Sequence, residues 1–463
     1  MPAADALPRS TPSAQEVASS GIAAFLDAVE AAPEVELHSL MVLRHGHVVA
    51  EGWWAPYSAD EPHLLYSLSK SFTATAAGLA AAEGLLSFDD PVVSYFPELA
   101  EAVTEPRTRS MQVRHLAAMA SGHLEDTLDR MVRLDGAEPV RGFLALPPEQ
   151  QPGSVFAYNN GATYVLGAIV QRVSGQTLLG YLRPRLLDPL GIGPGYWHQH
   201  PPGREVGFSG LHLRTEDIAR FGQLYLDDGL WRGERLLPEG WVADASALHT
   251  PNPAEPNPDW QQGYGYQFWR SQHGYRGDGA YGQFCLVLPE QDLVVVTTAQ
   301  TENMQRLIDA VWAHLLPACD GGTPDSDDAL AARLRAASLP ADGSGLVGTS
   351  LAEAETGWDL VRLEDHPAGG WTLVLAENGT EVSIVCGDGR WQLSDLALEQ
   401  GRVRVAAAAT ATPTGLVVQL AFVQTPHRLV LEVDRDSPRA TGRWLTIPLH
   451  APTLAGLATG RWS

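Results

Sequence analysis

The sequence predicts an α/β (α+β) fold: an antiparallel sheet flanked by helices, followed by a small, barrel-like C-terminal all-β domain. Two observations lead to this prediction. Within residues 13–317, strand-like segments lie near both ends and helical segments lie between them, which indicates one sheet assembled from distant parts of the chain. From about residue 347 the chain changes to short alternating runs separated by turns, which is typical of a barrel or a curled sheet.

The first elements are expected to be a helix and a β-hairpin. Residues 1–12 are expected to be disordered. Ser13 and Glu16 form a capping-box pattern, which predicts an amphipathic helix that continues through Ala31. The next two runs have strand character and are joined by a turn around Gly46: Ser39–Leu43 and Val48–Trp54.

Helices dominate the middle of the chain. A long apolar helix is predicted from Phe72 to about Leu86, and a largely helical section continues to about Leu248. The apolar helix Met304–Leu316 closes the first domain. Before it, three alternating runs predict antiparallel strands: Tyr264–Trp269, Tyr281–Leu288 and Leu293–Thr298.

The rest of the chain is a linker and the β domain. Residues 318–346, rich in proline, glycine and aspartate, are expected to form a linker with a short helix around 329–337. Residues 347–463 are assigned to the β domain, in which Asn378-Gly379 and Asp388-Gly389 favour tight hairpin turns. Its expected strands are Trp371–Leu375, Val382–Cys386, Val403–Ala407, Leu416–Val423, Leu429–Val433 and Trp444–Leu449.

Composition narrows the classes of function. The chain is 44% hydrophobic and 19% charged, as expected of a globular protein, and its net charge is −24. This acidity argues against nucleic acids and anionic membranes as partners, because both attract clustered lysine and arginine. No apolar run is long enough to span a bilayer and no secretory signal is evident, so a cytoplasmic location is expected.

Neither a metal site nor an organic cofactor is expected. The three cysteines lie far apart without CxxC spacing, which also argues against a disulfide framework. The two close histidine pairs lack neighbouring cysteine or carboxylate ligands. These residues are Cys285, Cys319, Cys386, His45/His47 and His198/His200.

Lys70 is the only lysine among the 31 lysine and arginine residues of the chain, and it follows Ser67 by three positions. On a helix this spacing places both side chains on one face. A guanidinium cannot lose its proton in a protein, whereas a partly buried lysine can be tuned toward neutrality and act as a base. The pair therefore predicts a serine nucleophile with lysine as its proton acceptor.

Two further segments supply candidate partners for this pair. Tyr158 and Asn160 lie two residues apart on a loop before an apolar helix, so a phenol and an amide can point into one cleft. Gly277 and Gly279 precede an apolar strand, where glycine lets a substrate backbone or an oxyanion approach closely. The structural alternatives are packing for Tyr158, helix capping for Asn160 and ordinary turns for the glycines.

Taken together, these elements resemble the penicillin-recognising serine enzymes: class C β-lactamases, DD-peptidases and related esterases. The markers are Ser-x-x-Lys, Tyr-x-Asn and a strand motif that normally begins with lysine or histidine. Further similar phrases lie at residues 116–122, residues 210–237 and Pro289-Glu290. The resemblance covers about residues 13–317 and implies a β-lactamase/transpeptidase-like domain, with the β domain outside it.

The resemblance also implies roles for the residues that match the motifs. Ser67 would be the nucleophile, and Lys70 would help to deprotonate it. Tyr158 would shuttle a proton to the leaving group, and Asn160 would orient both the substrate and Lys70. Whether Lys70 or Tyr158 is the acylation base is left open by the sequence.

The third motif departs from the family pattern. The best register places Gly277 where lysine or histidine is expected, with Gly279 as the motif glycine. The resemblance implies an oxyanion hole made by the backbone N–H groups of Ser67 and Ala280. Arg276 could supply the missing positive charge if its side chain points into the cleft. In β-lactamases and DD-peptidases the basic residue helps to bind a substrate carboxylate, so its absence weakens both assignments.

The expected function is hydrolysis of a small-molecule or peptide ester or amide through an acyl-Ser67 intermediate. The expected enzyme is a cytoplasmic esterase, amidase or D-amino-acid peptidase. One alternative is a peptide-cyclising thioesterase of a nonribosomal pathway, whose outline with a C-terminal β domain this chain shares. The other is a non-catalytic ligand-binding or regulatory relative. The altered third motif favours the non-catalytic alternative. Retention of the only lysine three residues after Ser67 argues for an enzyme instead.

Overall fold

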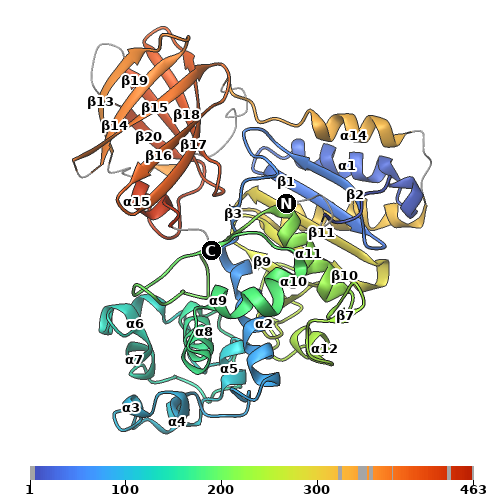
Figure 1. Ribbon diagram of the computed structural model, residues 1–463, viewed down its shortest axis with the longest axis vertical. Helices are drawn as coiled ribbons and strands as arrows, with labels where there is room; N and C mark the ends of the chain where they lie inside the picture. Colours follow the sequence, from blue (N-terminus) through green and yellow to red (C-terminus); the bar gives the residue numbers. More distant parts are fainter. Residues whose placement is uncertain are drawn as a thin grey trace.

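The central antiparallel sheet joins the two ends of the first domain. The computed structural model describes residues 6–321, 326–342, 352–353, 358–377, 379–434 and 440–460, and orders the six strands β2-β1-β11-β10-β9-β8 (Figure 1). Because β1 pairs with both β2 and β11, the first hairpin lies beside the last strand, which confirms the prediction of one sheet built from distant segments. The strands are β1 (Glu36–Arg44), β2 (His47–Trp53), β8 (Trp269–Arg270), β9 (Tyr275–Gly279), β10 (Gln283–Leu288) and β11 (Leu293–Gln300).

Helices cover both faces of this sheet, and alternate strand residues serve the two faces. In β11, Val294 and Val296 join a core that includes helices α2 and α11. Leu293 and Val295 join a second core with α1 and α13. These helices are α1 (Ser19–Glu30), α2 (Ser69–Ala82), α11 (Thr215–Leu226) and α13 (Met304–Ala310), the last continuing as a π-helical turn at Val311–Leu315.

A helical region extends away from the sheet and forms the lower part of the molecule in Figure 1. The buried helix α2 packs against α8 there and so connects the sheet to this region. Its helices are α3 (Pro97–Ala100), α4 (Pro106–Ser110), α5 (Val113–Ala117), α6 (Leu128–Leu134), α7 (Pro139–Leu144), α8 (Asn160–Ser174), α9 (Leu178–Leu182), α10 (Asp188–Leu190) and α12 (Trp241–Ala245). Small sheets are formed by β3 (His63–Leu64), β4 (Tyr196–Trp197) and β5 (Leu211–Leu213), and by β6 (Leu230–Trp231) and β7 (Glu234–Arg235).

The predicted capping box is wrong. Helix α1 begins at Ser19, because Glu16 adopts a left-handed conformation (φ 59°) that ends a short 3₁₀ turn at Ser13–Gln15. The Ser13 hydroxyl donates instead to Asp327, at 2.5 Å, in the helix that follows the first domain. The Ser13 side chain is therefore bonded to a residue far along the chain and does not cap helix α1.

Two other elements are shorter than predicted. Helix α2 ends at Ala82 rather than near Leu86, because Gly84 is left-handed (φ 72°). The strand expected at Tyr264–Trp269 is reduced to β8, because Gln267 has a positive φ of 60° and interrupts the extended chain.

The N-terminal segment is ordered where the structure describes it, so the expectation of disorder is wrong for residues 6–12. Leu7 is buried, and its N–H donates to Glu216 at 2.9 Å. Arg9 forms ion pairs with Glu51 at 2.9 Å and Glu216 at 2.7 Å. Residues 1–5 lie outside the described residues.

The C-terminal β domain is a separate curled sheet, drawn in orange to red in Figure 1. Its strands follow the order β12-β20-β19-β18-β17-β15-β14-β13, and β16 pairs with β17. The short helix α14 (Asp327–Arg335), expected from the sequence, lies in the connection beside α1 and β2. The strands are β12 (Ala352–Glu353), β13 (Trp358–Asp365), β14 (Trp371–Glu377), β15 (Thr380–Asp388), β16 (Gln392–Leu398), β17 (Gly401–Ala411), β18 (Gly415–Phe422), β19 (Arg428–Asp434) and β20 (Ala440–Trp444); helix α15 (Leu454–Leu457) follows. Asn378, half of one predicted hairpin turn, lies outside the described residues.

The β domain is fixed to the first domain by polar and apolar contacts. The Leu64 N–H donates to the Gln424 carbonyl at 2.9 Å, a backbone hydrogen bond between the two domains. Buried Arg428 forms an ion pair with Glu36 of β1 at 2.8 Å. Ala406, Ala421 and Val423 pack into the core that covers one face of the central sheet.

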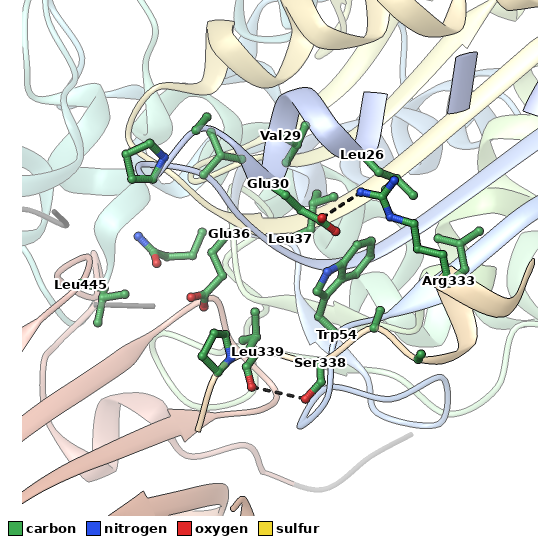
Figure 2. Close-up of a pocket in the computed structure, with 18 residues that line it drawn as sticks. Leu26, Val29, Glu30, Glu36, Leu37, Trp54, Arg333, Ser338, Leu339 and Leu445 are labelled. Carbon is green, nitrogen blue, oxygen red and sulfur yellow. Dashed lines mark hydrogen bonds and ion pairs between the residues drawn. The ribbon is translucent and has the colours of Figure 1, made fainter. Parts of the chain in front are cut away.

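A cavity of about 530 Å³ lies at this junction, between α1, the start of β1 and the segment after α14 (Figure 2). Leu26, Val29 and Leu37 contribute apolar walls. The charged groups at its rim are paired, since Arg333 binds Glu30 and Glu36 binds Arg428.

Among the described residues, no helix combines the length and apolar character that crossing a bilayer requires.

Candidate active site

Ser67 and Lys70 meet at the start of the central helix. Ser67 lies in the 3₁₀ turn Tyr66–Leu68, and Lys70 is the second residue of α2, which is buried from Ser69 to Ala80. The helical spacing brings the Lys70 Nζ to 2.8 Å from the Ser67 Oγ. The predicted pair of nucleophile and amine is therefore assembled on one helix face.

Three acceptors surround the Lys70 amine: the Ser67 Oγ at 2.8 Å, the Asn160 Oδ1 at 2.7 Å and the Phe208 carbonyl at 2.8 Å. They match the three protons of an ammonium group. The side chain is only 1% exposed, and this burial lowers the pKa of Lys70 to about 7, although Asp126 and Asp278 oppose the shift. When the amine is neutral, the Ser67 hydroxyl can donate to it, which is the arrangement that proton abstraction requires.

Tyr158 approaches the same serine from the other side. Tyr158 lines the same cavity as Ser67, and its ring stacks on Trp269 with centroids 5.7 Å apart. The Lys70 Nζ lies 4.7 Å from the centre of the Tyr158 ring. Burial raises the pKa of Tyr158, so this phenol stays protonated at neutral pH. The two candidate bases therefore differ in pKa, and only the pKa of Lys70 lies near neutral pH.

Asn160 is held in the site by a residue that sequence reasoning missed. Asn160 donates its Nδ2 to Asp126 at 2.6 Å, and its backbone N–H binds the same carboxylate at 2.9 Å. Asp126 thereby fixes the amide so that its oxygen faces Lys70. The cap of α8 is the neighbouring Asn159, whose side chain accepts from Ala162. The capping alternative thus belongs to Asn159 and leaves Asn160 free to face the site.

Gly279 brings the end of β9 against the turn that carries Ser67. A Cβ atom at this position would lie 2.1 Å from the Leu65 carbonyl oxygen, so only glycine fits. Ala280, in the following turn, lines the same cavity as Ser67. Ser67 and Ala280, whose backbone N–H groups are predicted to form the oxyanion hole, therefore line one cavity.

Position 277 has little room for a side chain in this structure. A Cβ atom on Gly277 would lie 2.2 Å from Leu68 Cδ1 and 3.1 Å from Ser71 Oγ, so Leu68 fills the space. Arg276 lies on the opposite face of β9, which it shares with Asp278, so its side chain does not occupy the space beside position 277.

The expectation that Arg276 lends positive charge to the cleft is wrong. Its side chain is fully buried, and it donates to Asp278 at 2.9 Å, Ser271 at 2.6 Å and the Arg270 carbonyl at 3.0 Å. Its guanidinium also stacks on Trp260, 4.3 Å from the ring centre. Arg276 therefore supports the floor of the site through Asp278.

A carboxylate, that of Asp278, lines the cleft, and the cation expected at position 277 is absent. The cavity at Ser67 has a volume of about 410 Å³ and combines aromatic walls with acidic groups. Burial raises the pKa of Asp278 to about 6, against the opposing effect of Arg276. The lining residues are Ser67, Phe156, Tyr158, Glu255, Asn257, Trp260, Trp269, Asp278, Ala280, Glu302, Asn303, Met304 and Gln305. Within the described ranges, no group of three or more His, Cys, Asp or Glu side chains is placed to hold a metal ion.

The fold and the site define a serine hydrolase built on a β-lactamase/transpeptidase-like domain. The sequence model of the Beta-lactamase family matches residues 25–316, more than half of the chain, and the protein belongs to that family. It is similar to the 6-aminohexanoate-dimer hydrolase of Paenarthrobacter ureafaciens, with 28% identity over 293 residues covering 56% of this chain and 71% of that one. It is also similar to esterase EstB of Burkholderia gladioli, with 30% identity over 208 residues covering 39% and 53%.

Solved structures show the same fold over the length of the chain. The structure of SurE with D-Leu has a TM-score of 0.52 at 21% identity and covers 92% of this chain and 98% of its own. The octameric penicillin-binding protein homologue from Pyrococcus abyssi has a TM-score of 0.51 at 18% identity, covering 92% and 99%. The combination of an α/β domain and a C-terminal β domain therefore also occurs in other proteins of this fold.

Proposed function

We propose that this protein hydrolyses an ester or amide through an acyl-Ser67 intermediate, with Lys70 as the acylation base. The observation that supports this most directly is the buried amine of Lys70, 2.8 Å from the Ser67 Oγ and with a pKa lowered to about 7 by burial. A base with a pKa near the operating pH combines an available lone pair with sufficient basicity. Tyr158, whose pKa is raised by burial, serves as a proton donor.

The proposed reaction proceeds in two half-reactions. Neutral Lys70 accepts the Ser67 proton as the Oγ bonds to the substrate carbonyl carbon, and the N–H groups of Ser67 and Ala280 bind the resulting oxyanion. Collapse breaks the bond to the leaving alcohol or amine, which takes its proton from Tyr158, and the Lys70 ammonium returns a proton to Tyr158. Water then attacks the acyl carbon and releases the acid and free Ser67.

The acidic cleft narrows the substrate class. Because Asp278 lines the cavity and, among the described residues, no lysine or arginine does, a substrate carboxylate would meet like charge there. We therefore favour esterase, amidase or D-amino-acid peptidase activity on substrates that are uncharged or carry an amine. The relative named 6-aminohexanoate-dimer hydrolase supports a substrate that carries an amine, although its named substrate carries a carboxylate as well. The three cysteines are buried and form no disulfide, which fits action in a reducing compartment such as the cytoplasm.

The charge of the cleft predicts a substrate preference. For matched nitrophenyl esters whose acyl chain ends in an amine or a carboxylate, we expect a higher kcat/KM for the amine. Asp278→Asn should shrink the ratio of the two kcat/KM values about tenfold, which corresponds to about 1.4 kcal/mol. Glu302→Gln, a control at an exposed rim position, should leave the ratio nearly unchanged. An unchanged ratio in Asp278→Asn would contradict the proposed charge selection.

The proposed function is tested by labelling the folded protein with a fluorophosphonate probe and mapping the modified peptide. We expect one adduct, on Ser67, and none in Ser67→Ala. Ser69→Ala is a suitable neighbouring control, because Ser69 is buried and accepts from the Leu211 N–H. If the folded wild-type protein stays unlabelled, the catalytic assignment fails and a ligand-binding role on an enzyme fold takes its place.

A further inference from the structure

Each of the two residues proposed to donate to the oxyanion has a tyrosine next to it in the chain, and both tyrosines have a positive φ. Tyr66 directly precedes Ser67 and has φ 47°, and Tyr281 directly follows Ala280 and has φ 69°. A bulky residue in the left-handed region costs of order 1 kcal/mol and persists only where its surroundings hold it. The two rings contact each other edge to face, with centroids 5.5 Å apart. The N–H groups of Ser67 and Ala280 are thus presented by a pair of strained tyrosines.

Both tyrosine hydroxyls are held by the β domain rather than by their own domain. The Tyr281 hydroxyl donates to the Ile447 carbonyl at 2.7 Å. The Tyr66 hydroxyl lies 2.5 Å from His427 Nε2 and accepts from the Leu449 N–H at 3.3 Å. Ile447 and Leu449 follow β20, and His427 directly precedes β19, the strand that pairs with β20, so neighbouring segments of the β domain contact both tyrosines.

The tautomer of His427 gives the bond to Tyr66 a fixed direction. His427 Nδ1 lies 3.0 Å from the Thr446 carbonyl, which can only accept, so this nitrogen carries the proton. Nε2 is then a lone-pair acceptor for the Tyr66 hydroxyl. Burial lowers the pKa of His427 to about 3, so the imidazole stays neutral at physiological pH. The contact is therefore a directed bond between neutral groups inside the domain junction.

We infer that the C-terminal β domain positions the oxyanion hole, with Tyr66, Tyr281 and His427 as positioning residues. This inference rests on the proposed function. The β domain restrains two strained backbone positions through the ends of their side chains, and those positions carry the N–H donors. Without the hydrogen bond from its hydroxyl, each tyrosine keeps its ring packing, but its backbone is no longer restrained. The N–H groups of Ser67 and Ala280 then no longer point at the substrate oxygen together. Because the oxyanion forms only in the transition state, the cost falls on kcat rather than on KM.

The experiment compares Tyr66→Phe and Tyr281→Phe with Tyr57→Phe as the matched control. The Tyr57 hydroxyl also donates to the β domain, to the Thr425 carbonyl at 3.4 Å, but Tyr57 is not a neighbour of Ser67 or Ala280 in the chain. Using a nitrophenyl ester hydrolysed by the wild-type protein, we expect kcat to fall about 10- to 100-fold in the first two variants, with KM within threefold. Tyr57→Phe should keep wild-type kcat.

A transition-state analogue separates positioning from general loosening of the fold. A phenylboronic acid forms a tetrahedral adduct with a serine, so its inhibition constant should rise by the same factor by which kcat falls in Tyr281→Phe. Wild-type kcat in both Tyr66→Phe and Tyr281→Phe would overturn the inference, as would an equal loss in Tyr57→Phe. Failure of the proposed function is distinguishable, because it would appear as an unlabelled Ser67 in the wild-type protein.

Discussion

Replacement of Lys70 by arginine should lower the rate of Ser67 acylation by about 10³-fold or more. General-base catalysis contributes about 10²- to 10⁴-fold, and a guanidinium cannot provide the free lone pair on which it depends. The change keeps a positive charge and hydrogen-bond donors, so it tests proton abstraction rather than charge. The measurement is the rate of fluorophosphonate labelling together with ester turnover. A variant that keeps more than a tenth of the wild-type rate would exclude Lys70 as the base.

The same base predicts the pH dependence of the wild-type protein. Because burial lowers the pKa of Lys70 to about 7 and the neutral amine is the active form, labelling should accelerate as pH rises, with its midpoint near 7. Tyr158→Phe should keep this midpoint while lowering turnover, because Tyr158 donates a proton later in the cycle. The residual rate of Lys70→Arg should show no such midpoint. A rise that first occurs above pH 9 would instead assign the base role to Tyr158.

Replacement of Arg428 by leucine should destabilise the protein by about 3 kcal/mol or more, because it removes a buried guanidinium together with its ion pair and its hydrogen bond. Arg428 is 1% exposed, and its guanidinium binds Glu36 at 2.8 Å and Gln419 at 2.9 Å. Burial raises the pKa of Glu36, but Arg428 and His38 outweigh it and hold the pKa below its ordinary value. The measurement is urea unfolding followed by tryptophan fluorescence.

Arg404→Leu is the matched control for this prediction. Arg404 also links the β domain to the first domain, through an ion pair with Glu61 at 2.6 Å, but its side chain is 37% exposed. Its loss should cost about 0–1 kcal/mol. The double variant Glu36→Leu/Arg428→Leu should recover much of the stability lost in Arg428→Leu, because no unpaired charge remains. Equal effects of the two arginine variants would contradict the importance of burial.

The parts of the site that are encoded locally could be predicted from the sequence. Ser67 and Lys70 are one helical turn apart, and Tyr158 and Asn160 share one loop, so spacing alone places each pair. Gly279 could be recognised because only glycine permits the close approach to the Leu65 carbonyl that the structure shows. Each of these inferences depends on a few neighbouring residues, which is why it can be made from the sequence.

The remainder of the site depends on contacts between distant segments. Arg276 and Asp278 stand in the same motif, and the choice between them depends on Trp260 and Ser271, which hold the guanidinium away from the cleft. Asp126 reaches Asn160 from a separate loop. Tyr66 and His427 are 361 residues apart and meet only because the β domain folds back onto the first domain. No periodicity or spacing in the sequence reports such pairings.

Because Lys70 is the only lysine in the sequence, proteolysis after lysine can report whether helix α2 is folded. An enzyme that cleaves only after lysine has one peptide bond available in the whole chain, that of Lys70, and would divide it into residues 1–70 and 71–463. In the folded protein that bond lies in the first turn of a buried helix, so cleavage requires local or global opening. The rate at which the two fragments appear therefore reports the population of the opened helix when reclosing is faster than cleavage, and the rate of opening when the protease is in excess.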